Sequence, residues 1–168
     1  FTPEDISQFY DTTWTVQSHA NRTGIRLDGP KPTWSRTDGG DAGLHPSNLH
    51  DNPYSVGALN VSGDTPILLG PDGPSLGGFA CPLTVVSGHR WKLGQIRPGD
   101  SLRFVPVTDA GAAALRTATV RGADLPPVER QTASDGGRLG RTEAVLDRPE
   151  AVYLRGGDDN ILVEYGDM

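Results

Sequence analysis

The sequence predicts an all-β or mainly β fold, a barrel or sandwich of short and mostly antiparallel strands with few helical turns. Glycine (22 residues) and proline (14 residues) stand at roughly twice their usual share and separate many short apolar runs. Several of these runs alternate apolar and polar side chains, which is typical of half-buried strands. Strands and helices do not alternate along the chain, which argues against a parallel nucleotide-binding sheet.

The first element that we expect is a short helix over residues 3–10. Thr2 can cap its N-terminus, and Pro3 suits the first helical position. Ile6 and Phe9 then fall on one face at helical spacing. The helix therefore has both a start signal and an apolar face to bury.

Short runs with strand character follow the helix. We expect strands at residues 14–19, 25–27, 55–63, 65–70, 82–87 and 102–107. Turn-forming residues at 21–24 and 98–100 precede two of these runs. Residues 88–96 could form one helical turn, and residues 71–79 read as a glycine-rich loop.

The stretch 31–52 shows little periodicity and is predicted to be a long loop. Ordered loops of this length in compact domains are usually functional.

The character of the chain changes after residue 107. Residues 109–116 resemble a short capped helix, and the polar, proline- and glycine-rich stretch 117–148 is typical of a linker. Residues 151–166 read as a hairpin around a Gly-Gly-Asp-Asp turn. We therefore expect a barrel domain over 1–107, a linker over 108–150 and the first hairpin of a following module over 151–168.

Overall composition narrows the classes of partner. The formal charge of −6 makes nucleic acid or an anionic membrane a poor partner. No apolar run approaches the roughly 20 residues of a membrane span. The single cysteine, Cys81, cannot form an internal disulfide, which favours a reducing compartment such as the cytoplasm. It lies in an apolar run and is expected to be a small buried side chain. The chain starts at Phe1 and ends in NILVEYGDM, which suggests a piece of a longer polypeptide.

The stretch GLHPSNLHDNPYSVGAL (43–59) is unusually rich in side chains that can do chemistry. One interpretation is a metal site, although the spacing of its candidate ligands matches no recognised pattern. Those ligands would be His45, His50, Asp41 and Asp51. A second is a turn-rich loop whose polar side chains bond the backbone. A third is a polar pocket for an amide-like substrate, in which Asp51 accepts from amino groups and Asn48 both donates and accepts.

A second candidate is GPSLG (73–77), which fits the G-x-S-x-G pattern of serine hydrolases with Ser75 as nucleophile. That motif needs a helix after the serine, and Gly77 and Gly78 open a stretch that cannot form one. Successive glycines instead favour a backbone nest for an anion or a pair of tight turns. Arg22 is either a surface charge or a clamp for a carboxylate.

Residues 1–107 resemble, nearly without a gap, the carboxyltransferase region of urea carboxylase, a biotin-dependent enzyme. The resemblance is carried by NRTGIRL, GLHPSNLHDNPY, GPDGPSLGGF and IRPGD, and LVEYGDM resembles the start of the next module. It implies a cyclophilin-like β-barrel, a family module also called allophanate hydrolase subunit 2. More loosely, the chain is similar to the C subunit of 5-oxoprolinase and to an antagonist of a sporulation kinase inhibitor, and both appear without the HPSNLHDN stretch.

The resemblance also implies a reaction. Another domain would use ATP, Mg²⁺ and bicarbonate to carboxylate biotin, and a carrier domain would bring carboxybiotin to this region. CO₂ would then pass to a nitrogen of urea, or of guanidine, and urea would give allophanate. The remaining half of the carboxyltransferase domain would complete the site. The resemblance assigns substrate contacts to Asn48, His50 and Asp51, and a loop near the biotin carboxyl group to Ser75, Gly77 and Gly78, with Asp72 and Arg22 as further candidates.

Overall fold

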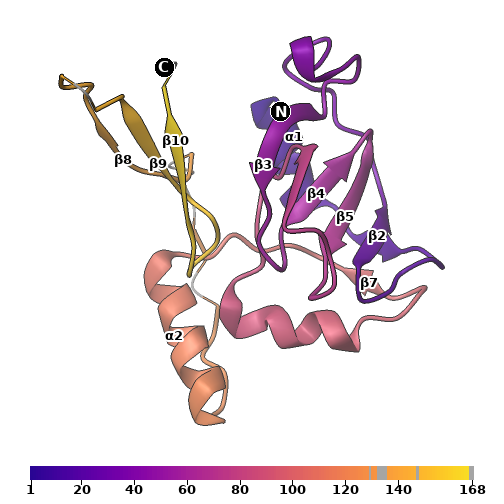
Figure 1. Ribbon diagram of the computed structural model, residues 1–168. Helices are drawn as coiled ribbons and strands as arrows, with labels where there is room; N and C mark the ends of the chain where they lie inside the picture. The colour runs from indigo at the N-terminus through magenta and orange to yellow at the C-terminus, as the bar shows by residue number, and fades with distance from the viewer. Residues whose placement is uncertain (129, 132–135, 147, 167–168) are drawn as a thin grey trace.

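The computed structural model describes residues 1–128, 130–131, 136–146 and 148–166, and it contains two β-structured parts (Figure 1). The strands of the larger part are β1 (Trp14–Val16), β2 (Gly24–Asp28), β3 (Asn48–Pro53), β4 (Leu59–Ser62), β5 (Thr65–Leu69), β6 (Leu76–Phe79) and β7 (Ser101–Leu102). The smaller part holds β8 (Arg138–Thr142), β9 (Ala151–Arg155) and β10 (Ile161–Tyr165). The helices are α1 (Pro3–Asp11), η1 (Gly40–Ala42), η2 (Ser87–Gln95) and α2 (Asp109–Arg121). The predicted mainly β class with a short N-terminal helix is confirmed.

The central sheet has the strand order β4-β5-β2-β1-β7, and its neighbouring strands are antiparallel. Its register places Ile25 beside Leu68 and Leu68 beside Leu59, so these side chains form one apolar row. That row belongs to the buried core, together with Phe9, Trp14, Val16, Leu27 and Val61. The opposite face of the same strands carries the row of Arg26, Ile67 and Asn60.

Helix α1 is fixed at its N-terminal end by hydrogen bonds of Asp5. Thr2 and Asp5 form a reciprocal capping box, which satisfies two amide groups at the helix start. The Asp5 carboxylate also accepts from the amides of Thr33 (2.6 Å) and Trp34 (3.0 Å). Burial alone would raise the pKa of Asp5, but these backbone hydrogen bonds outweigh it and hold the pKa below its usual range. The predicted helix over 3–10 is confirmed, one residue longer than expected.

Two predicted loops are in fact strands. Residues 48–52 of the expected loop 31–52 belong to β3, residues 76–79 of the expected loop 71–79 form β6, and the two strands pair with each other. A register shift between Asn48 and Asn52 interrupts this ladder. The irregular pairing and the glycines of β6 explain why neither segment alternates cleanly in the sequence.

Four predicted strands are much shorter than expected. The expected strand 14–19 is reduced to β1 and the expected strand 55–63 to β4. Within residues 82–87, the structure has only an isolated bridge between Thr84 and Ala58. The expected strand 102–107 is reduced to β7, whose last residue is Leu102. Further along, the same segment has only an isolated bridge between Val107 and Arg130. Residues 87–95 form the 3-10 helix η2, which is longer than the single turn expected.

The expected linker 108–150 contains regular structure, so that prediction was wrong at two places. Helix α2 runs to Arg121 and ends at Gly122 in the left-handed conformation, five residues beyond the expected helix. Residues 138–142 form β8, which pairs with β9. A strand at the edge of a small sheet needs only one partner, and this partner lies further along the chain. No helix in the described residues is both long and apolar enough to cross a membrane.

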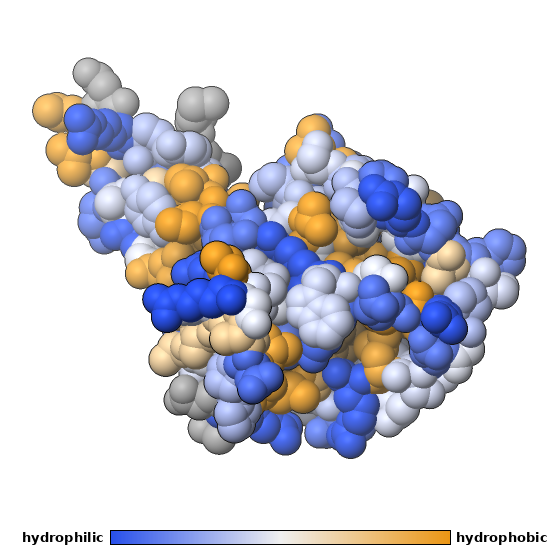
Figure 2. All heavy atoms as spheres, turned by 90° about the horizontal axis from the view of Figure 1, so that it is seen from below, coloured by the Kyte–Doolittle hydropathy of each residue, from blue (hydrophilic) through white to orange (hydrophobic). Residues whose placement is uncertain are grey.

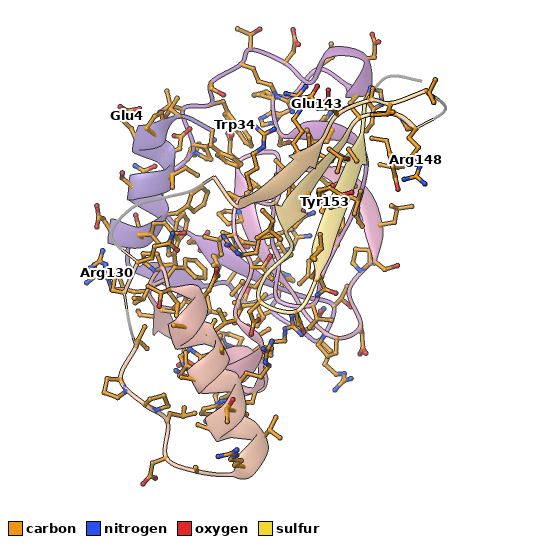
Figure 3. All side chains as sticks on the ribbon, turned by 90° about the vertical axis from the view of Figure 1, so that its left-hand side faces the viewer. Glu4, Trp34, Arg130, Glu143, Arg148 and Tyr153 are labelled. Carbon is orange, nitrogen blue, oxygen red and sulfur yellow. The ribbon has the colours of Figure 1, made fainter. Side chains whose placement is uncertain are left out.

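The predicted hairpin of β9 and β10 is confirmed, and its tip is attached to the larger part. The Asp158 carboxylate accepts from the amide (2.7 Å) and the hydroxyl (2.6 Å) of Ser87 at the start of η2. Arg90 forms a bidentate pair with Asp159. Gly88 lies so close to α2 that a Cβ there would be 2.6 Å from the carbonyl carbon of Leu115. Figure 3 shows the resulting arrangement, with the three-stranded sheet that carries Tyr153 standing above α2.

Candidate functional site

The two candidate segments of the sequence come together in space as the β3–β6 ladder. Asn48 pairs with Phe79, and Asn52 pairs with Gly77. Tyr54 follows β3 and fixes the ladder from the side, because its hydroxyl accepts a 2.6 Å hydrogen bond from the Phe79 amide. The stretches that sequence motifs singled out separately are therefore one structural unit.

The glycines of this unit do not form an anion-binding nest, which corrects one of our alternatives. Gly77 and Gly78 lie within the extended strand β6, whereas a nest needs helical and left-handed residues in succession. Close packing explains both positions. A Cβ on Gly77 would be 2.7 Å from the ring of Tyr54, and one on Gly78 would be 2.8 Å from the carbonyl oxygen of Leu49.

Ser75 lies exposed just before β6, and its carbonyl oxygen accepts from the amide of Tyr54 (2.8 Å). The chain continues into a strand rather than the helix that a nucleophile elbow requires. The geometry of a serine hydrolase is therefore not formed at Ser75.

The three predicted substrate contacts lie on β3 in different surroundings. Asn48 is half-buried, and its side-chain amide packs against Gly43, where a Cβ would be only 2.3 Å from Nδ2. Arg36 donates to the Asn48 carbonyl oxygen and holds this end of the strand. His50 and Asp51 are exposed. The structure thus offers His50 and Asp51 to a partner, whereas Asn48 already contacts its own chain.

His45 belongs to a structural network, not to the exposed part of β3. Its Nδ1 is 2.9 Å from the hydroxyl of Ser47, a side chain with no exposed surface. Its Nε2 lies 3.4 Å from Asp64, which also accepts from the Trp34 indole at 3.1 Å. The indole hydrogen bond is the main reason that the pKa of Asp64 lies below its usual value. Among the described residues, no three His, Cys, Asp or Glu side chains gather as a metal site would require.

Arg22 and Asp72 are partners of each other. Arg22 Nε and Nη2 donate to the two oxygens of Asp72 at 2.6 and 3.0 Å. Both side chains are largely exposed, at 74% and 52%. The pair raises the pKa of Arg22 and lowers that of Asp72. Arg22 does clamp a carboxylate, but that carboxylate belongs to the chain itself.

A cavity of about 440 Å³ lies between β6 and the non-core face of the central sheet. Gly77 is the one predicted site residue that lines it. The polar lining residues that sequence reasoning missed are His19, Asn21, Thr23, Arg26, Tyr54, Asn60 and Ser62. One signal was present in the sequence: Arg26 stands between Ile25 and Leu27, so the strand turns it away from the core.

Asn60 is the buried polar side chain of this cavity, with 4% of its surface exposed. It hydrogen-bonds Tyr54, and its Nδ2 is 3.9 Å from the sulfur of Cys81. Burial raises the pKa of the Cys81 thiol to about 12, which makes it unreactive, although the residue is only half-buried rather than fully buried as predicted. Burial is also the largest cause of the raised pKa of Tyr54.

A second hollow of about 490 Å³ lies beside α2 and residues 123–126. Half of its lining residues are alanines, and its polar lining residues are Thr117, Arg121 and Asp124. It borders none of the predicted site residues.

Residues 1–106 match the family model described as the carboxyltransferase domain, subdomain A and B. The chain belongs to this family. It is 42% identical over 99% of its length to urea amidolyase of Saccharomyces cerevisiae, and 35% identical over 98% to a putative urea carboxylase of Emericella nidulans. The crystal structure of the Kluyveromyces lactis urea carboxylase superposes on 99% of the chain with a TM-score of 0.91 and 41% identity.

These relatives are much longer than the chain. It spans 10% of the S. cerevisiae protein, 15% of the E. nidulans protein and 16% of the K. lactis urea carboxylase chain. The comparison therefore assigns the chain to one region of such proteins.

Proposed function

We propose that the chain is part of the carboxyltransferase domain of a biotin-dependent urea or guanidine carboxylase, a ligase that forms a C–N bond. The observation that carries this proposal is the match of nearly the whole chain to urea amidolyase at 42% identity. In this proposal ATP and Mg²⁺ act in another domain of a longer cytoplasmic protein, and the chain alone is inactive. Carboxybiotin, carried on a further domain, supplies CO₂ for transfer to a substrate nitrogen, and urea yields allophanate.

The role of the chain's own residues is to position and to bind. Exposed His50 and Asp51 on β3 can accept hydrogen bonds from the amino groups of urea or guanidine. Asn48 fixes the end of the strand against Gly43 and so acts on the substrate by positioning β3. On the biotin side, Gly77 lines the cavity, with Ser75 and Gly78 beside it. A rigid ladder that holds these groups suits a reaction that depends on orientation.

The remaining half of the domain is proposed to pack on the β8–β9–β10 sheet. Several large apolar side chains of this part are exposed, namely Leu139, Val145, Leu146, Ile161, Val163 and Tyr165. Figure 2 shows apolar residues gathered on the projecting part of the molecule. Contiguous exposed apolar surface usually marks an interface. In this proposal residues 151–168 open the following module.

The experiment that tests the function uses the full-length parent protein. ATP hydrolysis would be measured with bicarbonate in the presence of urea, of guanidine or of neither. Stimulation by one of them is expected and would name the substrate. Absence of stimulation by either would reject the carboxylase proposal in favour of chemistry like that of 5-oxoprolinase or of a binding module.

The site assignment has its own test in the same protein. Asp51→Ala is expected to lower substrate-stimulated turnover while biotin carboxylation stays intact. Asn48→Ala should do the same through the displaced strand. Unchanged substrate-dependent ATP hydrolysis in both variants would remove β3 from the site.

A further inference from the structure

The cavity between β6 and the central sheet carries positive charge without a matching carboxylate. Arg26 is the charged residue of its lining, and none of its lining residues is aspartate or glutamate. Within the described residues, the Arg26 guanidinium takes part in none of the ion pairs or side-chain hydrogen bonds of the chain. A guanidinium in such a place has donors available for a ligand.

Comparison with Arg22 shows that the unpaired state of the Arg26 guanidinium among the described residues depends on its position in the fold. Arg22 lies four residues earlier, and Asp72 occupies its guanidinium in a bidentate pair. Two carboxylates, on β2 and on β3, do not line the cavity. Asp28 follows on the same strand face, but it accepts from Gln17 Nε2 at 2.7 Å. Asp51 lies on β3, the strand that pairs with β6.

The remaining lining suits a small ligand that also carries an amide. Arg26, Ile67 and Asn60 form one row across β2, β5 and β4, so the charged group and the buried amide stand on the same wall. Asn60 can both donate and accept; its side chain hydrogen-bonds Tyr54, and its Nδ2 also makes a long contact of 3.9 Å with the sulfur of Cys81. Apolar contact comes from Ile67, and the volume of about 440 Å³ lies in the usual range of roughly 300–1,000 Å³ for small-molecule sites.

We propose that this cavity binds a ureido carboxylate, with Arg26 paired to the carboxylate and Asn60 to the ureido group. The inference rests on the proposed function, because both a carboxylated biotin ring and the allophanate product present this same chemical group. It reassigns carboxylate recognition from Arg22 to Arg26.

The test measures binding to the 168-residue chain by two-dimensional ¹H–¹⁵N NMR, without any catalytic readout. Two stable probes separate the two sources: N-carbamoylglycinate is open like allophanate, and 2-oxoimidazolidine-1-acetate is cyclic like the biotin ring. The neutral amides of both acids serve as controls. We expect saturable shifts at Gly24, Asn60 and Gly77 with at least one anion and with neither amide.

Substitutions then test the assigned group. Arg26→Gln should weaken binding by at least about tenfold, since a hydrogen-bonded charge is lost. Arg26→Lys should retain part of it, and the matched surface variant Arg22→Gln should stay within about twofold of the original. Absence of saturation with both anions, equal binding of the amides, or full binding by Arg26→Gln would overturn the proposal. If neither anion binds the chain but urea stimulates ATP hydrolysis by the parent protein, only the cavity assignment is rejected. If an anion binds but neither urea nor guanidine stimulates ATP hydrolysis, only the proposed function is rejected.

Discussion

The Asp158 carboxylate is one of the groups that attach the β9–β10 hairpin to η2, and Asp158→Ala should weaken this attachment. Helix η2 begins without a side-chain cap of its own, because its N-cap residue is Val86. Asp158, 71 residues further along, accepts from both the amide and the hydroxyl of Ser87. Its side chain is only 9% exposed, and Arg116 lies 3.6 Å away. The Asp158 carboxylate therefore caps the N-terminus of η2 from a distant segment of the chain.

The expected loss of free energy follows from the hydrogen bonds that the substitution removes. A hydrogen bond to a charged group contributes roughly 1.5–3 kcal/mol, and a helix cap about 1 kcal/mol. Two such bonds to one residue are not additive, so we expect a loss of about 2–4 kcal/mol. At 1.4 kcal/mol for each factor of ten, amide exchange in β9 and β10 should accelerate roughly 30- to 1,000-fold.

Native-state hydrogen exchange is the assay that can see this locally. The amides of β2 and β5 should change much less than those of β9 and β10. Ser87→Ala removes one of the two bonds and should give a smaller effect, with little added in the double variant. Asp72→Ala, at an exposed pair with Arg22, is the matched control and should leave the hairpin unchanged. Unaltered exchange in β9 and β10, or an equal change throughout the chain, would refute the reasoning.

Three further predictions concern single side chains. Gly77→Ala should destabilise the chain by about 1–3 kcal/mol in urea unfolding, because the new Cβ would overlap Tyr54, and an unchanged midpoint would contradict that packing. Cys81 should resist iodoacetamide at pH 8 in the native chain and react in denaturant, since its thiol pKa is about 12; rapid native labelling would show it to be accessible. Asp5 has a lowered pKa, so its stabilisation is complete above its ordinary pKa and is lost as the pH falls below about 4; Asp5→Asn should remove this part of the acid dependence, and an identical pH profile would refute the assignment.

Local signals in the sequence were sufficient where an element is determined by its own residues. Helix α1 was predicted because Thr2 and Pro3 mark its start, and the β9–β10 hairpin because a Gly-Gly-Asp-Asp turn separates two apolar runs. Strands β2 and β5 were predicted from the apolar residues that form the core row. These elements bury one face, so apolar residues recur in the sequence with the period of the helix or strand.

Elements that depend on a distant partner were missed because their own residues carry no such period. Strand β6 is mostly glycine and phenylalanine, and its extended form follows from pairing with β3. Strand β8 lies in a polar stretch and exists because β9 offers an edge. In the site, strand alternation turns Arg26 away from the core, but the sequence does not show that a carboxylate from another segment reaches Arg22. Motif spacing could therefore find the two segments of the site, but not the cavity beside them.

The β3–β6 ladder gives a physical reason why the two recognition tasks can be joined on one element. Asp51 is adjacent to Asn52, which pairs with Gly77 in the wall of the cavity. Paired strands lie about 4.7–4.9 Å apart, so the exposed acid of β3 and the cavity are separated by little more than the ladder itself. The negative charge of Asp51 contributes to the raised pKa of Tyr54, which lines the cavity. Amino groups would then be recognised on the acidic side of the ladder and a carboxylate on the Arg26 side. A partner domain that covers both sides would complete the site without having to supply either charge.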